Sequence, residues 1–215
     1  MGVNRNVKKL VTVSALALGL AACSSTGGGG FGGISPYGLV RAGQTVNVGS
    51  GAMSVTSPRE WNRQGSFLSF NDVRWVEDWT LNGPYLDGIT FVTGLPDNKR
   101  LVWQEYKADR QVPRFRSTMT APEVASLLET LFRVEGGSVE FKTLGLAPRA
   151  FLGTGGFQLD FEHLDGDEVW RKGRAIGAVI DGRLYMIMLD AARAHYYPQA
   201  LPDYEAIVRS AVRRR

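Results

Sequence analysis

The fold is decided by residues 157–189, which read FQLDFEHLDGDEVWRKGRAIGAVIDGRLYMIML. Apolar and polar side chains alternate over residues 157–162, which is typical of a strand with one buried face. The two Asp-Gly dipeptides inside the stretch predict hairpin turns. The strands on either side of the second turn, 169–180 and 183–189, are apolar on both faces. We therefore expect these two strands at the centre of one antiparallel sheet.

Upstream of this stretch, further strands are predicted by runs of β-prone residues between turn signals. These runs are 45–48, 52–56, 75–81, 89–95, 101–106 and a strand that starts near Val139. Gly-Ser-Gly separates the first two runs, and Asn82-Gly83 with Asp87-Gly88 lies between the third and the fourth. Each separation predicts an antiparallel connection within the sheet.

Two helices are predicted by apolar stripes. Thr120 and Glu123 form a capping box, after which five apolar residues fall at helical spacing before Gly136-Gly137 ends the pattern. These residues are Val124, Leu127, Leu128, Leu131 and Phe132. A second stripe follows Pro202 and runs to Val212, and its terminal arginines would suit the negative end of the helix dipole.

The patterns together predict one α+β domain over residues 36–215. The run 53–61, in which a strand is followed by Pro58 and Trp61, resembles the opening of PsbP/Mog1-type domains. The ending resembles them too, with Gly173-Arg174-Ala175 entering one strand, Tyr185 leading another and a last helix at 204–210. The resemblance does not extend to 62–118. It implies an α/β/α sandwich with a central antiparallel sheet and two main helices, in a fold whose members are often non-enzymatic binding or assembly factors.

The first 22 residues read as an export signal. A basic start is followed by the apolar residues 10–22, which are too few for the about 20 that span a bilayer. The end of this stretch, Leu20-Ala21-Ala22-Cys23, resembles the lipobox of bacterial lipoproteins. The resemblance implies cleavage between Ala22 and Cys23, a diacylglycerol thioether on Cys23 and acylation of the new amine. The alternatives are an ordinary secretory signal with a chance cysteine and a signal-anchor helix.

Residues 23–35 are rich in glycine and serine and predict a tether between lipid and domain. Ser24 stands where an aspartate would retain an enterobacterial lipoprotein at the inner membrane. We therefore expect the outer membrane, with the domain facing the periplasm.

Charge argues against a nucleic-acid partner. The formal net charge is +4, but three basic residues lie in 1–22, and the remainder holds 22 basic against 21 acidic residues. Four of those 22 are Arg209, Arg213, Arg214 and Arg215, so residues 23–208 hold 18 basic against 21 acidic residues and have no basic excess to follow a phosphate backbone. Because Cys23 is the single cysteine, no disulfide can form within the chain.

One acidic cluster surrounds a predicted hairpin. It comprises Asp160, Glu162, Asp165, Asp167 and Glu168. These residues are a candidate cation site or partner surface, but their spacing fits no EF-hand loop, and a solvated turn is the alternative. His163 shares the apolar face of its strand with Phe161, so we expect it to be packed and hydrogen-bonded. The other histidine of the chain is His195, and two histidines without a third ligand predict no zinc site.

The remaining candidates are a cluster of basic residues and the sequence motifs of hydrolases. Four basic residues near Pro113 could hold an anion or simply be solvated; they are Lys107, Arg110, Arg114 and Arg116. The common nucleophile and zinc-hydrolase motifs are absent from the sequence. We predict no catalytic residue, metal or cofactor.

Three hypotheses follow from these features. The first is a non-catalytic envelope protein that binds or scaffolds another component. The second is a hydrolase of peptidoglycan or lipid, with polar groups of the acidic hairpin or of 107–116 in one cleft. The third is a small-ligand carrier, which needs an apolar cavity of about 300 Å³ or more between sheet and helices.

Overall fold

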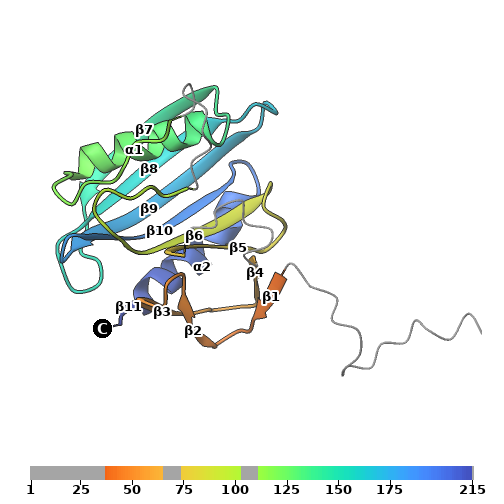
Figure 1. The fold of residues 1–215 in the computed structure, drawn as a ribbon. Helices are drawn as coiled ribbons and strands as arrows, with labels where there is room; N and C mark the ends of the chain where they lie inside the picture. Colours follow the sequence, from red (N-terminus) through yellow and green to blue (C-terminus); the bar gives the residue numbers. More distant parts are fainter. Residues whose placement is uncertain (1–36, 65–73, 103–110, 215) are drawn as a thin grey trace, which may run out of the picture. The chain divides into compact units, whose positions relative to one another are not determined.

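The computed structural model describes residues 37–64, 74–102 and 111–214 (Figure 1). All of them belong to one compact unit, Ser35–Arg215. Two hydrophobic cores are built within this unit, so it carries its own packing. The predicted signal, the tether and the rest of residues 1–34, which form the other unit, lie outside the described residues.

The larger of two sheets has eight strands, and all neighbours in it are antiparallel. Their spatial order is Tyr37–Val40 (β1), Trp61–Gln64 (β4), Val76–Thr80 (β5), Asp87–Leu95 (β6), Arg183–Ala192 (β10), Trp170–Ile180 (β9), Phe157–Leu164 (β8) and Glu140–Pro148 (β7). The predicted meander therefore forms as expected, with β9 and β10 in the interior of the sheet. The strands β1 and β7 form the two edges of this sheet.

A second, three-stranded sheet corrects the expectation of a single sheet. It consists of Val212–Arg213 (β11), Met53–Thr56 (β3) and Thr45–Val48 (β2). The β2–β3 hairpin was predicted, but its turn bonds to β5 and β6 through side chains instead of extending their sheet. Gly49 donates its backbone N–H to Glu77, and Ser50 donates both its backbone N–H and its hydroxyl to Thr93.

The helix Ala121–Val134 (α1) has the predicted bounds. The backbone N–H of Thr120 donates to the carboxylate of Glu123 at 2.7 Å, which satisfies one donor at the helix start. Gly137, with φ of 67°, follows the end of the helix in the left-handed region that glycine favours.

The helix Tyr196–Ser210 (α2) begins before the predicted start at Pro202. Pro202 removes only one intrahelical hydrogen bond, and the burial of Tyr197 and Ala200 anchors the turns that precede it. The helix also ends earlier than the stripe indicated, because Val212 enters β11 and pairs with Ser54. Arg213 therefore does not cap the helix, and it bonds instead to Asp181 at 2.7 Å.

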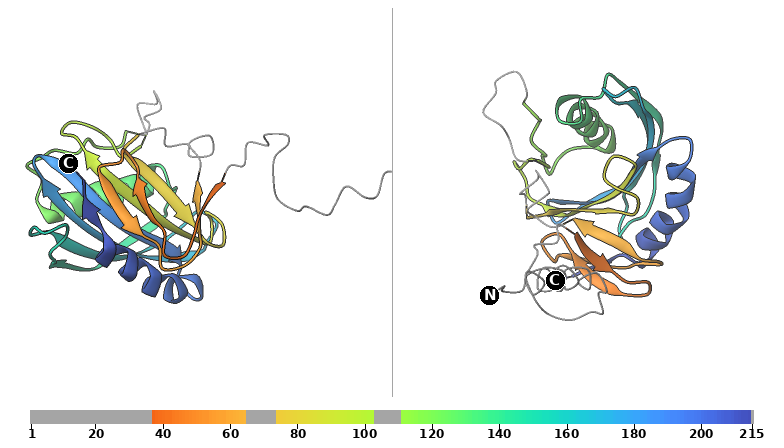
Figure 2. Two further views of the ribbon diagram at one scale, coloured as in Figure 1. Left: turned by 90° about the horizontal axis from the view of Figure 1, so that it is seen from below. Right: turned by 90° about the vertical axis from the view of Figure 1, so that its right-hand side faces the viewer.

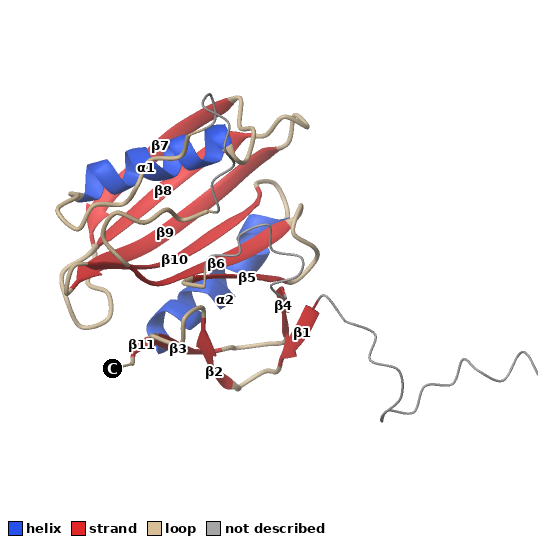
Figure 3. Ribbon diagram, viewed as in Figure 1, coloured by secondary structure: helices blue, strands red, loops and turns tan. Residues whose placement is uncertain are grey.

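The two helices pack against opposite faces of the large sheet (Figure 2). Along β10, Met186 and Met188 belong to the core that contains α1, whereas Ile187 and Leu189 belong to the core that contains α2 and the small sheet. Figure 3 shows both helices beside the sheet strands. An α+β fold with an antiparallel sheet and two helices is thus confirmed for the described residues.

Two short strands were not predicted. β1 and β4 have only four residues each, and β4 reads WNRQ, so neither gives a clear alternation. The predicted strand 101–106 is not found where it is described, since Leu101 and Val102 form a bend and residues 103–106 lie outside the description. No helix among the described residues is long and apolar enough to cross a membrane.

Candidate binding cleft

Three neighbouring strands, β5, β6 and β10, form the floor of a cleft. Two rows of side chains cross these strands on the face that α1 shares; they are Val76–Val92–Met186 and Asp78–Thr90–Met188. The strand period of two places the next residues of β5, Glu77 and Trp79, on the opposite face. There the indole of Trp79 donates to Glu77 at 2.7 Å.

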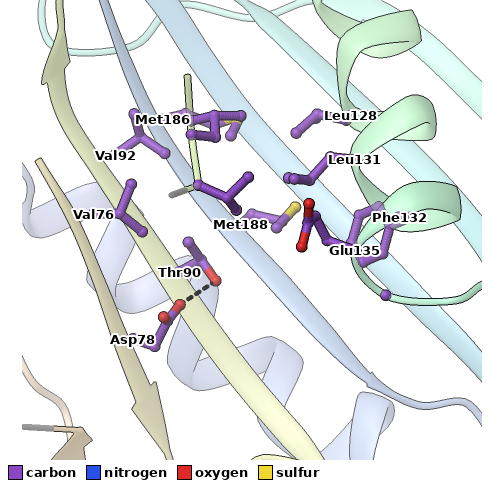
Figure 4. Close-up of a pocket in the computed structure, with 13 residues that line it drawn as sticks. Val76, Asp78, Thr90, Val92, Leu128, Leu131, Phe132, Glu135, Met186 and Met188 are labelled. Atoms are coloured by element: carbon purple, nitrogen blue, oxygen red, sulfur yellow. Dashed lines mark hydrogen bonds between the residues drawn. The ribbon is translucent and has the colours of Figure 1, made fainter. Parts of the chain in front are cut away.

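The walls of the cleft come from α1 and from residues after β6. Phe132 packs on the half of the sheet that contains β7 and β8. Its ring centroid lies 5.8 Å from that of Phe141 on β7 and 5.2 Å from that of Phe161 on β8. The helix therefore lies over the β7–β8 half of the sheet, and a cleft remains between the helix and the side chains of β5, β6 and β10. This cleft holds about 540 Å³. Figure 4 shows Leu128, Leu131, Phe132 and Glu135 along the side formed by α1 and its end. Gly136, Leu101 and Val102 also line the cleft.

Asp78 is the main polar group on the floor. The hydroxyl of Thr90 donates to it at 2.6 Å, and the described residues offer it no other hydrogen bond (Figure 4). Burial raises the pKa of Asp78; the bond from Thr90 opposes this effect and the nearby charge of Glu77 adds to it. Glu135 is exposed at the rim, and no described lysine or arginine lines the cleft.

A smaller hollow of about 230 Å³ continues from the cleft past Asp78. It shares Asp78, Thr90, Phe132 and Met188 with the cleft and adds Gln64, Pro84, Gly88, Arg171 and Asp190. Asp78 thus stands where the two spaces meet.

His163 lies in a buried ion cluster beside this hollow. Its side chain is almost fully buried, with Nε2 2.9 Å from Asp190 and Nδ1 2.8 Å from Asp165. Burial alone would lower the pKa of His163, but the bonds to Asp165 and Asp190 outweigh burial and raise it to about 9. Arg171 Nε lies 2.8 Å from the second oxygen of Asp190, so two cations meet two carboxylates.

The same cluster brings Ser138, His163 and Asp190 into contact, which is the residue set of a hydrolytic triad. Ser138 Oγ lies 2.9 Å from His163 Nδ1 and 3.2 Å from Asp165. Protonated at neutral pH and bonded to a carboxylate at each nitrogen, the imidazole has no lone pair with which to take the serine proton. Ser138 is also buried, so the arrangement serves packing and agrees with the expected role of His163.

Two of the predicted acidic residues face the other side of the sheet. Asp160 bonds to Arg174 at 2.6 Å, and Arg174 also bonds to Glu205 of α2 at 2.8 Å. Glu162 bonds to Arg193 at 3.2 Å. These carboxylates are already paired with arginines and lie away from the cleft.

The other three acidic residues do not join Asp160 and Glu162. Asp165 turns toward His163, Asp167 accepts the backbone N–H of Val169 at 3.2 Å, and Glu168 is exposed with φ of 66°. Within the described ranges, no group of three metal-ligating side chains could hold an ion. The five residues therefore do not converge on one site, and their role as a partner surface stays a prediction.

Several predicted features cannot be placed. Ala22, Cys23, Lys107 and Arg110 lie outside the described residues. Arg114 and Arg116 are exposed; Arg114 donates to the carbonyl of Asn98, and Arg116 lies 3.9 Å from Asp97.

The cleft residues were not singled out from the sequence. The signal was present in β5, where Asp78 occurs at the same parity as Val76 and thus on a face that the pattern would make apolar. Met186 and Met188 on β10 face the same space, but a strand that is apolar on both faces gives no hint of which face is left uncovered.

The comparisons with known proteins found matches among solved structures. No model of a known family and no curated protein matches the sequence. The solved structure of cyanobacterial PsbP (CyanoP) from Synechocystis sp. PCC 6803 is similar, with a TM-score of 0.53 and 15% identity, over 89% of this chain and 99% of that one. This likeness shows a PsbP-like fold and agrees with the resemblance in the sequence.

A second structure matches less well. It is PA94 from Pseudomonas aeruginosa, described as a protein of unknown function and putative regulator, with a TM-score of 0.43 and 16% identity, over 65% of this chain and 82% of that chain. At this level of similarity it adds nothing to the assignment of the fold or the cleft.

Proposed function

We propose that this protein is a non-catalytic binding protein of the cell envelope, tethered to the outer membrane by lipid on Cys23, and that the cleft beneath α1 binds a small apolar ligand. The observation that carries the proposal is the cleft of about 540 Å³ between helix and sheet, lined mainly by apolar side chains. Ligand sites in proteins typically occupy 300–1,000 Å³ and combine apolar walls with few polar groups. The small-ligand carrier is therefore the form of binding that the geometry favours.

Catalysis has less support than binding. None of the five acidic residues around the hairpin lines the cleft; Asp160 and Glu162 pair with Arg174 and Arg193, and Asp165 pairs with His163. The serine and histidine that meet near Asp190 lack a free base. The acidic hairpin therefore gives the hydrolase hypothesis no support. Of its other source of polar groups, residues 107–116, only 111–116 are described, and Arg114 and Arg116 are exposed there.

Binding at the cleft can be tested with the neutral fluorophore N-phenyl-1-naphthylamine and a chain of residues 35–215. Val76 is half-buried on the floor, so Val76→Trp should fill the cleft and weaken probe binding about tenfold or more. Leu144→Trp on exposed β7 is the matched control and should bind like the wild type. Equal binding by the two variants, with both folded by circular dichroism, would contradict the proposal.

The anchor needs a separate experiment with the full chain. Labelled palmitate fed to an expressing bacterium should appear on the wild-type protein and not on Cys23→Ala. Wild-type protein without the label, or a Cys23→Ala variant that still partitions into membranes after export, would contradict a lipid anchor on Cys23.

A further inference from the structure

We propose that the cleft selects a ligand with an apolar body and a protonated amine, and that Asp78 receives the amine. This inference rests on the proposed function, since it assigns a chemical class to the ligand of the same cleft. It draws on the charges that line the space, on the bonds already made by the neighbouring arginine, and on the shape of the floor.

The charges that the described residues bring to the cleft have one sign. Asp78 on the floor and Glu135 at the rim are the titratable side chains among its described lining residues, and both are acidic. A fatty acid would place its carboxylate against carboxylates, whereas an ammonium group would gain an ion pair in a poorly solvated space.

Arg171 does not reverse this preference, although it lines the adjoining hollow. Its Nε bonds to Asp190 at 2.8 Å, one terminal nitrogen donates to the carbonyl of Tyr85 at 2.7 Å, and the other reaches the carbonyl of Asp190 at 3.3 Å. An anionic ligand would have to compete with these bonds.

Asp78 has acceptor capacity left over. An ionised carboxylate can accept about four hydrogen bonds, and Thr90 supplies one. Burial raises the pKa of Asp78, which is the response of a carboxyl group without a countercharge. An ammonium group placed at the junction of cleft and hollow would supply both the donors and the charge.

The rest of the cleft suits a flexible hydrocarbon body. Met186 and Met188 lie side by side with Val92 and Thr90 on the floor, and the unbranched methionine side chain adapts to irregular shapes. The apolar side chains of Leu128 and Leu131 face them from α1 (Figure 4).

The test uses ligands with one tail and different heads. Octylammonium, 1-octanol, octanoate and octylphosphocholine compete with N-phenyl-1-naphthylamine for residues 35–215 at pH 8. We expect octylammonium to displace the probe at a concentration about tenfold lower than octanol, with octanoate the weakest. Octylphosphocholine, which carries a phosphate beside its cation, should be weaker than octylammonium and separates a lipid headgroup from a simple amine.

Variants then assign the preference to a residue. Asp78→Asn keeps the acceptor for Thr90 but removes the charge, so octylammonium and octanol should become equal while probe binding persists. Glu135→Gln should reduce the preference less, because Glu135 is exposed. The control Glu129→Gln removes a charge that pairs with Arg133 at 3.0 Å outside the cleft lining, and it should leave the preference unchanged.

The outcomes separate the two proposals. If octanol and the probe bind at the cleft but octylammonium is not preferred, or if octanoate or octylphosphocholine binds best, the amine assignment is wrong and the proposed function stands. A preference that survives in Asp78→Asn also overturns the assignment. If neither octanol nor the probe binds, the proposed function itself fails.

Discussion

The two halves of the sheet face that carries α1 differ in how densely they are packed and in how their charges are paired. Over β7, β8 and β9, the side chains of α1 fill the volume, and His163 and Arg171 of these strands pair with Asp165 and with Asp190 of the adjoining β10. Over β5, β6 and β10 a cleft remains beside the helix, and Asp78 accepts a hydrogen bond from Thr90 but forms no ion pair with any described residue. Packing and ion pairs stabilise the first half. The second half keeps the half-buried carboxyl group of Asp78, and a cationic ligand would offset the free-energy cost of burying its charge.

The largest effect is expected from breaking the ion cluster. Asp190→Ala removes the carboxylate shared by His163 and Arg171 and leaves both cations buried without their main partner. Urea denaturation should show a free energy of unfolding lower by about 3–5 kcal/mol. Asp167→Ala on the exposed turn is the control and should change it by less than about 0.5 kcal/mol. Similar small losses in both variants would mean that the cluster does not stabilise the filled half.

The pH dependence of stability tests the same cluster. Because the pKa of His163 is raised from 6.5 to about 9, its stabilisation is complete below pH 6.5 and is lost as pH rises through 9. The free energy of unfolding should therefore fall by up to about 3 kcal/mol over this window. His163→Gln should flatten the profile between pH 6.5 and 9, and an equally steep fall in that variant would assign the effect to another group.

Adding volume distinguishes the filled half from the open one. A Cβ on Gly173 of β9 would collide with the ring of Phe161, so Gly173→Ala should lower the free energy of unfolding by about 1–3 kcal/mol. Gly145→Ala on β7 is the control, since a Cβ there meets nothing within 4 Å. Val76→Trp adds more atoms but enters the cleft and should cost less than Gly173→Ala. A larger loss for Val76→Trp would show that the cleft is not open space.

The smallest effect concerns the open half. Since burial raises the pKa of Asp78, its charged form destabilises the folded protein at pH values above that pKa. Asp78→Asn should raise the free energy of unfolding at pH 8 slightly, and the gain should vanish below the ordinary aspartate pKa of 3.8. A loss of stability at pH 8 would mean that the ionised carboxylate is favourably paired.

The local patterns predicted most of the sheet and α1 because periodicity and turn residues act over a few neighbours. The alternation after Phe157, the two Asp-Gly turns and the capping box at Thr120 each correspond to an observed element. Pro202 was misleading, because buried contacts earlier in α2 outweigh one missing hydrogen bond. The second sheet was missed because β11 pairs with β3 across most of the chain.

The cleft could not be predicted in the same way. It exists because α1 packs on one half of a sheet face, and the length and position of a helix on a sheet are tertiary properties. The acidic residues around the 164–169 turn are close in sequence and therefore suggest one site, but strand alternation sends Asp160 and Asp165 to different surroundings. Asp78 lies next to Glu77 in a short strand and gave a weaker local signal, although it is on the floor of the cleft.

Methyl NMR tests the central claim most directly. With the methionine methyl groups labelled in residues 35–215, titration with N-phenyl-1-naphthylamine should shift Met186 and Met188, which line the cleft, in a saturable way. Met53, fully buried in the opposite core, should stay unchanged. Saturable shifts confined to Met186 and Met188 are the predicted result. The absence of shifts at these two residues, or equal shifts at Met53, would contradict a ligand site beneath α1.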